Sequence, residues 1–193
     1  MKRFKTPRGA FFLFIAVILV LIAYYLLSLK TKNNEPNEVP LTAVQTVLMR
    51  DLERNYPQTP KEVIKYYSEI TKCFYNEEYT EEELSQLAMK AKELYDEELA
   101  GNKDDETYLI DLKAEIAEFK AKNQAISSYT PSSSTDVFYF KQDGYEFARL
   151  YCTYSIRIGT YIQPLEEIFV LRMDENGHWK IYGWDNVQNV QAQ

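Results

Sequence analysis

The sequence predicts an α+β protein: an N-terminal transmembrane helix, then several helices packed on a curved antiparallel sheet of about four strands. Three observations predict this fold class: an uncharged apolar run near the N-terminus, helical periodicity between residues 41 and 123, and strand-like alternation from residue 136 onward. Helices followed by an antiparallel meander favour a sheet wrapped on the helices, as an α+β sandwich or an open cone. After the apolar run and a linker, about 155 residues remain, which suits one domain.

The first element is the apolar run over residues 10–29, which contains no charged residue. A helix of this length spans about 30 Å, the thickness of the hydrocarbon layer of a bilayer. The run ends in bulky residues where a signal peptidase requires small ones, so we expect a retained anchor whose partner is the lipid bilayer. Residues 1–9 form the basic tail before it, with four positive charges against two just after the run. This asymmetry predicts a single-pass plasma-membrane protein with its N-terminus in the cytoplasm and its C-terminal domain outside, in the cell envelope.

The charge distribution excludes one class of partner. Residues 1–32 carry six basic and no acidic residues, which leaves 16 basic and 29 acidic residues, a net charge of −13, for the rest of the chain. Such a domain repels the phosphates of nucleic acids, so nucleic-acid binding is not expected.

Helical segments open the predicted domain, which spans 41–185 after a polar linker over 30–40. Apolar residues recur at helical spacing over 41–55, and Tyr56-Pro57 ends that helix. Thr59 and Thr80 each stand three residues before a glutamate, the pattern of a capping box that opens a helix. Gly101 is placed to end the helix that Thr80 opens, and a fourth helix is expected over about 104–123.

Strands follow a predicted loop over 127–135. We expect strands over 137–140, 145–158, 167–173 and 178–184, with hairpin turns at 143–144 and 176–177 and a loop through Gly159 and Pro164. The apolar phase of the 145–158 strand shifts by one residue, which indicates a β-bulge near 148–149. Residues 186–193 are polar and are expected to form a flexible tail.

The final strands carry a resemblance. Residues 167–173, the Asn176-Gly177 turn and the segment from His178 to Trp184 resemble the closing hairpin of the nuclear-transport-factor-two-like superfamily. That resemblance implies a bent sheet curled around helices into a cone, a scaffold used by enzymes and binding modules alike. The whole chain is also similar to uncharacterised single-pass membrane proteins of Gram-positive bacteria. Catalytic members of the superfamily pair an Asp with a His inside the cone, whereas the one histidine here, His178, lies beside a predicted turn.

No motif of the sequence indicates catalysis, a metal site or a cofactor, so none is expected. The two cysteines, Cys73 and Cys152, are far apart in the chain and belong to no metal-binding pattern; we interpret them as buried apolar residues, and whether they form a disulfide stays open. An enzyme of the cone superfamily would need a buried acid, for which Asp143, Glu146 and Glu166 are available.

The aromatic residues of the predicted sheet are the best candidates for a binding site. If they line the mouth of a cone, Tyr139, Tyr154, Arg157 and Trp184 would form an apolar pocket with a few polar tips for a small ligand. The simpler interpretation is that aromatic residues fill a curved sheet because they are good strand formers. Our leading hypothesis is therefore a non-catalytic envelope module that binds an envelope protein or a small ligand. An enzyme and a self-associating structural protein are the alternatives.

Overall fold

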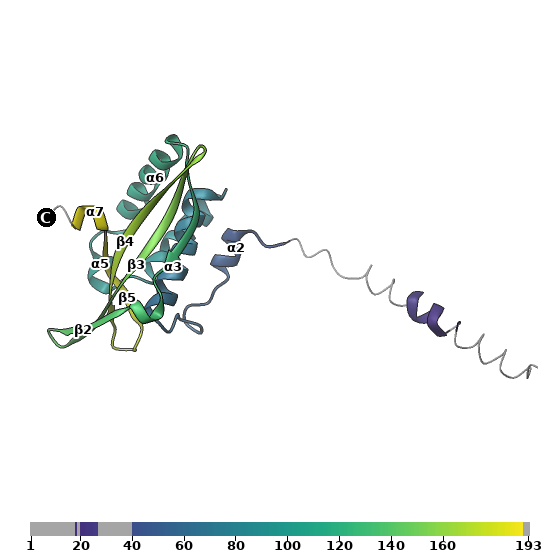
Figure 1. The fold of residues 1–193 in the computed structure, drawn as a ribbon, viewed down its shortest axis with the longest axis horizontal. Coiled ribbons are helices and arrows are strands. Elements are labelled where there is room, and N and C mark those ends of the chain that lie inside the picture. Colours follow the sequence, from purple (N-terminus) through teal and green to yellow (C-terminus); the bar gives the residue numbers. More distant parts are fainter. Residues whose placement is uncertain (1–17, 19, 27–39, 191–193) are drawn as a thin grey trace, which may run out of the picture. The chain divides into compact units, whose positions relative to one another are not determined.

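The computed structural model describes residues 18, 20–26 and 40–190. The chain divides into two units, Met1–Pro40 and Leu41–Gln193, of which the second holds the helices and strands described below. That unit is an α+β domain in which helices precede a five-stranded antiparallel sheet (Figure 1). The α+β class predicted from the sequence is thus confirmed. The number of strands is five rather than about four.

The membrane-spanning helix expected over 10–29 has to be corrected. Of that range the structure describes residues 18 and 20–26, and the rest lies outside the described residues. Within the described parts of the chain, no helix combines the length and the apolar character needed to cross a bilayer. The fold is therefore an α+β domain without a membrane-spanning helix among its described residues. The lipid bilayer as partner and the location outside the cytoplasm stay predictions of the sequence alone.

The helices begin where their caps predict. Helix α3 (Pro60–Asn76) and helix α4 (Glu81–Lys92) are each opened by the expected capping box, in which the threonine oxygen accepts a backbone N–H and the glutamate reaches back. Helix α6 (Asp105–Ala121) agrees with the predicted fourth helix. The first helix is shorter than expected: α2 spans Ala43–Leu48, because the Asp51 carboxylate accepts the N–H groups of Glu53 and Arg54 and forms a turn instead.

The third predicted helix is in fact two. Helix α4 ends at Lys92, and a short helix α5 (Glu97–Gly101) begins at Asp96, whose side chain caps it. Between them the backbone pairs with the last strand: Asp96 donates its N–H to the Ile181 carbonyl, and Ile181 donates to Leu94, both at 2.8 Å. The prediction of one helix up to Gly101 was wrong because helical periodicity does not reveal a local strand-like contact with a distant segment.

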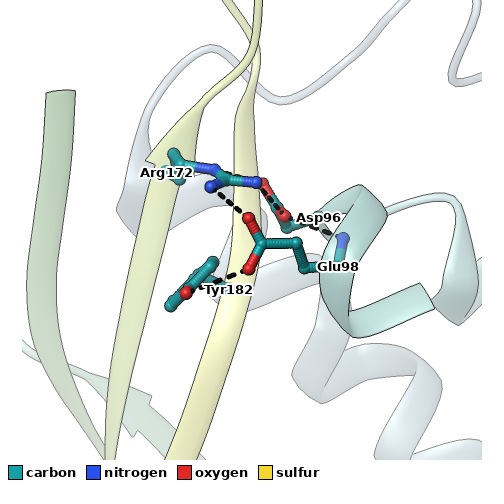
Figure 2. A network of polar contacts seen from close by, with 4 residues as sticks. All are labelled: Asp96, Glu98, Arg172 and Tyr182. Carbon is teal, nitrogen blue, oxygen red and sulfur yellow. Dashed lines mark hydrogen bonds and ion pairs between the residues drawn. The ribbon is translucent and has the colours of Figure 1, made fainter. Parts of the chain in front are cut away.

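A charged network holds α5 against the sheet (Figure 2). The Arg172 guanidinium donates two hydrogen bonds to the Asp96 carboxylate, at 2.8 and 2.5 Å, and one to Glu98 at 2.7 Å. Tyr182 donates to the other oxygen of Glu98 at 3.1 Å, and the guanidinium lies over the rings of Tyr145 and Tyr182. Because Asp96 is 4% exposed, this pairing supplies the charge compensation that a buried carboxylate requires.

The sheet is built around its long central strand. Strand β3 (Tyr145–Ile158) pairs on one edge with β4 (Tyr161–Met173) and on the other with β1 (Gln124–Pro131) and β2 (Phe138–Gln142). Strand β5 (Trp179–Asn186) pairs with β4 and closes the order β1-β3-β4-β5. Strand β1 occupies most of the segment expected to be a loop, and a single 3₁₀ turn, η1 (Ser134–Asp136), separates it from β2.

The sheet bends at positions other than the predicted one. The β3–β4 pairing runs without interruption from Phe147 to Ile158, so the bulge expected near 148–149 is absent there. Register shifts occur instead in β1 between Ile126 and Ser128, and in β4–β5 between Val170 and Leu171. The apolar phase of β3 changes because Tyr145 and Phe147 lie on the outer face of the sheet, whereas Leu150 and Cys152 face the helices.

Both predicted hairpin turns are confirmed. Asp143 and Gly144 have φ values of 51° and 88°, the left-handed pair that a two-residue hairpin requires, and Gly177 has φ 79°. Strand β4 begins already at Tyr161 and therefore includes Pro164, which lies where β4 has no pairing with β5, so its missing N–H breaks no ladder. At the other end, residues 186–190, expected in a flexible tail, form the end of β5 and helix α7 (Val187–Val190).

The core lies between the helices and the inner face of the sheet. Alternate residues of β3 from Ala148 to Ile156 are buried, and their neighbours on the outer face are more exposed. Helix α3 contacts β1, β3 and β5, and α6 contacts β1 (Figure 1). Side chains do not fill the whole space between the helices and the sheet, and the cavity that remains is the candidate site.

Candidate functional site

The candidate site is a cavity of about 420 Å³ between the helices and the inner face of the sheet. A cavity of this size is in the range that holds small-molecule ligands. Its walls come from α3, the end of α4, α5, α6 and the strands β1, β3, β4 and β5. Eight of its lining side chains are large aromatic residues: Tyr67, Phe74, Tyr75, Tyr95, Tyr108, Phe119, Tyr154 and Trp184.

The aromatic rings form a connected cluster. Tyr67 lies 5.6 Å from Trp184 and 6.0 Å from Tyr95, measured between ring centroids, and Tyr95 lies 5.7 Å from Trp184. Phe169 of β4 packs against the cluster. Its ring centroid lies 5.8 Å from that of Tyr67, and it stacks with Trp184 at 6.2 Å. The cluster exists because the helical stripe of α3 and the inward positions of β4 and β5 face each other across the cavity.

The tyrosine hydroxyls are joined by hydrogen bonds. Tyr95 and Tyr108 share a hydrogen bond of 3.2 Å, and the ring of Tyr67 packs against that of Tyr95. Tyr154 donates to Ser68 at 2.8 Å, and Ser68 in turn donates to the Ile64 carbonyl. Burial raises the pKa of Tyr67, Tyr95 and Tyr154 well above the ordinary value, so these phenols are neutral hydrogen-bonding groups at physiological pH.

One carboxyl group in the cavity has no hydrogen-bond or ion-pair partner in the part of the chain that the structure describes. Glu167 lies on the inner face of β4, directly opposite Cys152 of β3, and is partly buried. No described residue donates a hydrogen bond to it or forms an ion pair with it. Burial, together with the charges of Glu115 and Asp185, raises the pKa of Glu167 to about 7. The group therefore changes charge near neutral pH.

The two lysines that line the cavity are already paired. Lys92 forms an ion pair with Asp105 at 2.6 Å, and Lys103 forms one with Asp111 at 2.5 Å. The carboxylate of Glu115 accepts a hydrogen bond from Tyr75 but has no cation within ion-pair distance in the described residues. The charge left over in the cavity is therefore negative.

The predicted ligand-binding residues separate into two groups. Tyr154 and Trp184 line the cavity, as the binding hypothesis required of them. Tyr139 and Arg157 do not: Tyr139 is 55% exposed and contacts Trp179, and Arg157 is an exposed residue between Ala125 and Ile162 on the neighbouring strands. Two of the four residues predicted from the sequence to bind a ligand therefore line the cavity.

The acids considered for catalysis lie elsewhere. Asp143 is in the β2–β3 turn, Glu146 pairs with Lys141, and Glu166 is exposed on the outer face. Their neighbour Glu167 was missed, although a signal existed. Phe169 and Leu171 are the apolar inward positions of that strand, and Glu167 shares their parity.

The histidine and the two cysteines considered in the sequence analysis lie outside the lining of the cavity. His178 is half-buried, stacks on Tyr56 with ring centroids 4.3 Å apart, and lies 3.7 Å from the Asp174 carboxylate. Cys73 and Cys152 are buried and not joined by a disulfide, which confirms their interpretation as small buried residues.

Comparison with known proteins gives one result. No curated protein matches the chain significantly. A family model, described as "Domain of unknown function (DUF6715)", matches residues 1–184. Since the match covers 184 of the 193 residues, including every lining residue of the cavity, the chain belongs to the DUF6715 family.

Proposed function

We propose that this protein is a non-catalytic binding module whose inner cavity takes a small, mostly apolar ligand. The observation that carries the proposal is the cavity itself, which has a volume of about 420 Å³ and is lined by eight large aromatic side chains together with polar groups. Apolar walls supply the affinity of such sites, and isolated polar groups fix the orientation of the ligand. A domain that only needed a stable core would fill this space, because voids in a core are destabilising.

The polar groups of the cavity are arranged for orientation. The hydroxyls of Tyr95 and Tyr108 are joined by a hydrogen bond on the helical side of the cavity, and Glu167 lies on its sheet side. A ligand with an aromatic or aliphatic body would contact the rings and place one polar group at Glu167. Such a site needs no catalytic set.

The test is a binding screen on the full-length chain by ligand-observed NMR with small aromatic compounds: 2-phenylethanol, 2-phenylethylamine and phenylacetate. Leu165→Trp would fill the cavity from β4, and Ile162→Trp, at a 64% exposed position of the same strand, is the matched control. We expect at least one compound to bind the native chain and the control, and to lose binding in Leu165→Trp. Absence of binding by all three compounds, or equal binding by both variants, would contradict the proposal.

A second candidate function is an enzyme that transfers a proton. The observation in its favour is the pKa of Glu167, raised to about 7, which suits a general acid or base at neutral pH. A catalyst would change bound compounds, for example by exchanging an acidic C–H for deuterium in heavy water, and Glu167→Gln would abolish the exchange. A binding module returns every compound unchanged.

A further inference from the structure

The charges around the cavity do not balance. Asp111, Glu115 and Glu167 line it together with Lys92 and Lys103. Lys103 is paired with Asp111, and Lys92 is paired with Asp105 outside the lining. This leaves Glu115 and Glu167 without a cation among the described residues. A ligand that enters this space therefore meets a negative potential.

The aromatic walls of the cavity also favour a cation. The rings of Tyr67, Tyr95 and Trp184 lie within 6.0 Å of one another, and the π-faces of aromatic rings attract cations. One such cation–π contact is already present among the lining residues: the Lys92 ammonium lies 5.7 Å from the ring centroid of Tyr108. An unpaired carboxylate beside clustered aromatic faces is a combination that recognises an ammonium group.

We propose that the ligand of this cavity is an organic cation, a primary or quaternary ammonium on an apolar body, whose charge pairs with Glu167. This inference rests on the proposed binding function and adds the chemical class of the ligand. The body of the ligand occupies the space between Tyr67, Tyr154 and Trp184, and the ammonium supplies the cation that Glu167 lacks.

The pH dependence follows from the groups that face Glu167. These are Tyr67 and Tyr75 from α3, Glu115 from α6, Cys152 and Tyr154 from β3, and Asp185 from β5. Below its pKa the Glu167 carboxyl is neutral and no longer attracts a cation. Binding of an ammonium therefore weakens as the pH falls through about 7, by at most about 30-fold between pH 8 and 5.5.

The experiment compares three probes of nearly equal size on the full-length chain by isothermal titration calorimetry. They are 2-phenylethylamine, which stays protonated at both pH values, the neutral 2-phenylethanol, and the anion phenylacetate. At pH 8 we expect the amine to bind at least tenfold more tightly than the alcohol, a difference of about 1.4 kcal/mol, and phenylacetate not to bind. Glu167→Gln should reduce the affinity for the amine to that for the alcohol, and Glu166→Gln, its exposed neighbour, should leave both unchanged.

The outcomes separate the inference from the function on which it rests. If the alcohol binds as tightly as the amine, or Glu167→Gln does not change the amine's affinity, the cation inference is overturned and the binding function stands. If none of the three probes binds, the binding function itself fails. A thermal melt of Glu167→Gln establishes that the variant is folded.

Discussion

Glu115 on α6 and Glu167 on β4 line the same cavity, and the negative charge of Glu115 raises the pKa of Glu167. Like charges in a poorly solvated space repel each other, and burial adds to the effect. The arrangement is unfavourable for the ionised form of Glu167, because both burial and a neighbouring negative charge oppose it. Unfavourable arrangements of this kind are concentrated at functional sites.

The first prediction concerns stability against pH. Glu167 titrates near 4.5 in the unfolded chain and near 7 in the folded one, so the folded state binds more protons between these values. The free energy of unfolding therefore falls as the pH rises from 4.5 to 7, by about 2–3 kcal/mol from this group. The Glu167→Gln variant lacks the titrating carboxyl and so does not lose this stability as the pH rises. We expect its free energy of unfolding to exceed that of the native chain by about 2 kcal/mol at pH 8 and to equal it at pH 4.5.

Urea unfolding at a series of pH values measures this effect. The control is Glu166→Gln, which removes an exposed carboxyl from the outer face and should change stability by less than about 0.5 kcal/mol at any pH. A pH-independent difference between Glu167→Gln and the native chain would show that the carboxyl is not held in a poorly solvated site.

The second prediction concerns the charged network of Figure 2. Arg172→Met keeps the length of the side chain but leaves the Asp96 carboxylate buried without its cation. We expect the free energy of unfolding to fall by about 3 kcal/mol, since breaking one partner of a buried pair is costly. Arg54→Met removes an exposed pair with Asp51 and should cost less than about 0.5 kcal/mol. Chemical denaturation measures both changes. If the two substitutions lower the free energy of unfolding equally, the network does not stabilise the packing of α5 on the sheet.

The third prediction concerns the thiols. Burial raises the pKa of Cys73 to about 11 and also raises that of Cys152, so neither forms an appreciable thiolate at pH 7. Both should resist a disulfide exchange reagent such as DTNB in the native chain and react at once in denaturant, which gives two equivalents of free thiol. Rapid reaction of one thiol under native conditions would contradict the burial of that residue.

The fourth prediction concerns the buried hydroxyl pair at the cavity wall. Ser68 accepts a hydrogen bond from Tyr154, and both residues are less than 4% exposed. We expect Tyr154→Phe and Ser68→Ala each to cost about 1 kcal/mol of unfolding free energy, with less than the sum in the double variant. Additive effects in this double-mutant cycle would show that the two hydroxyls do not interact.

The sequence was informative where local chemistry determines structure. The capping boxes at Thr59 and Thr80 and the turns at Asp143-Gly144 and Asn176-Gly177 were all correctly predicted, because each depends on a few neighbouring residues. The first strand was missed for the opposite reason. Its polar residues look like a loop, and only pairing with β3, around 28 residues later, makes them a strand.

The candidate site was predicted in part for similar reasons. Tyr154 and Trp184 were named because they belong to aromatic-rich strands, whereas Tyr67 and Tyr95, which come from the helical part of the chain, were not named as site residues. The cavity that unites them depends on how far the helices stand from the sheet, which no local pattern encodes. Glu167 became a candidate only through the structure, which places it on the inner face of β4 with no cation beside it among the described residues.

The most direct test of a ligand site inside the domain is an intermolecular NOE measurement on the full-length chain with 2-phenylethylamine at pH 8. The account predicts NOEs from the probe to ring protons of Tyr67, Tyr154 and Trp184, which line the cavity. The outer face of the sheet offers a competing aromatic surface with Phe138, Tyr145 and Tyr182 exposed. NOEs to those outer residues instead of the inner ones would contradict the account.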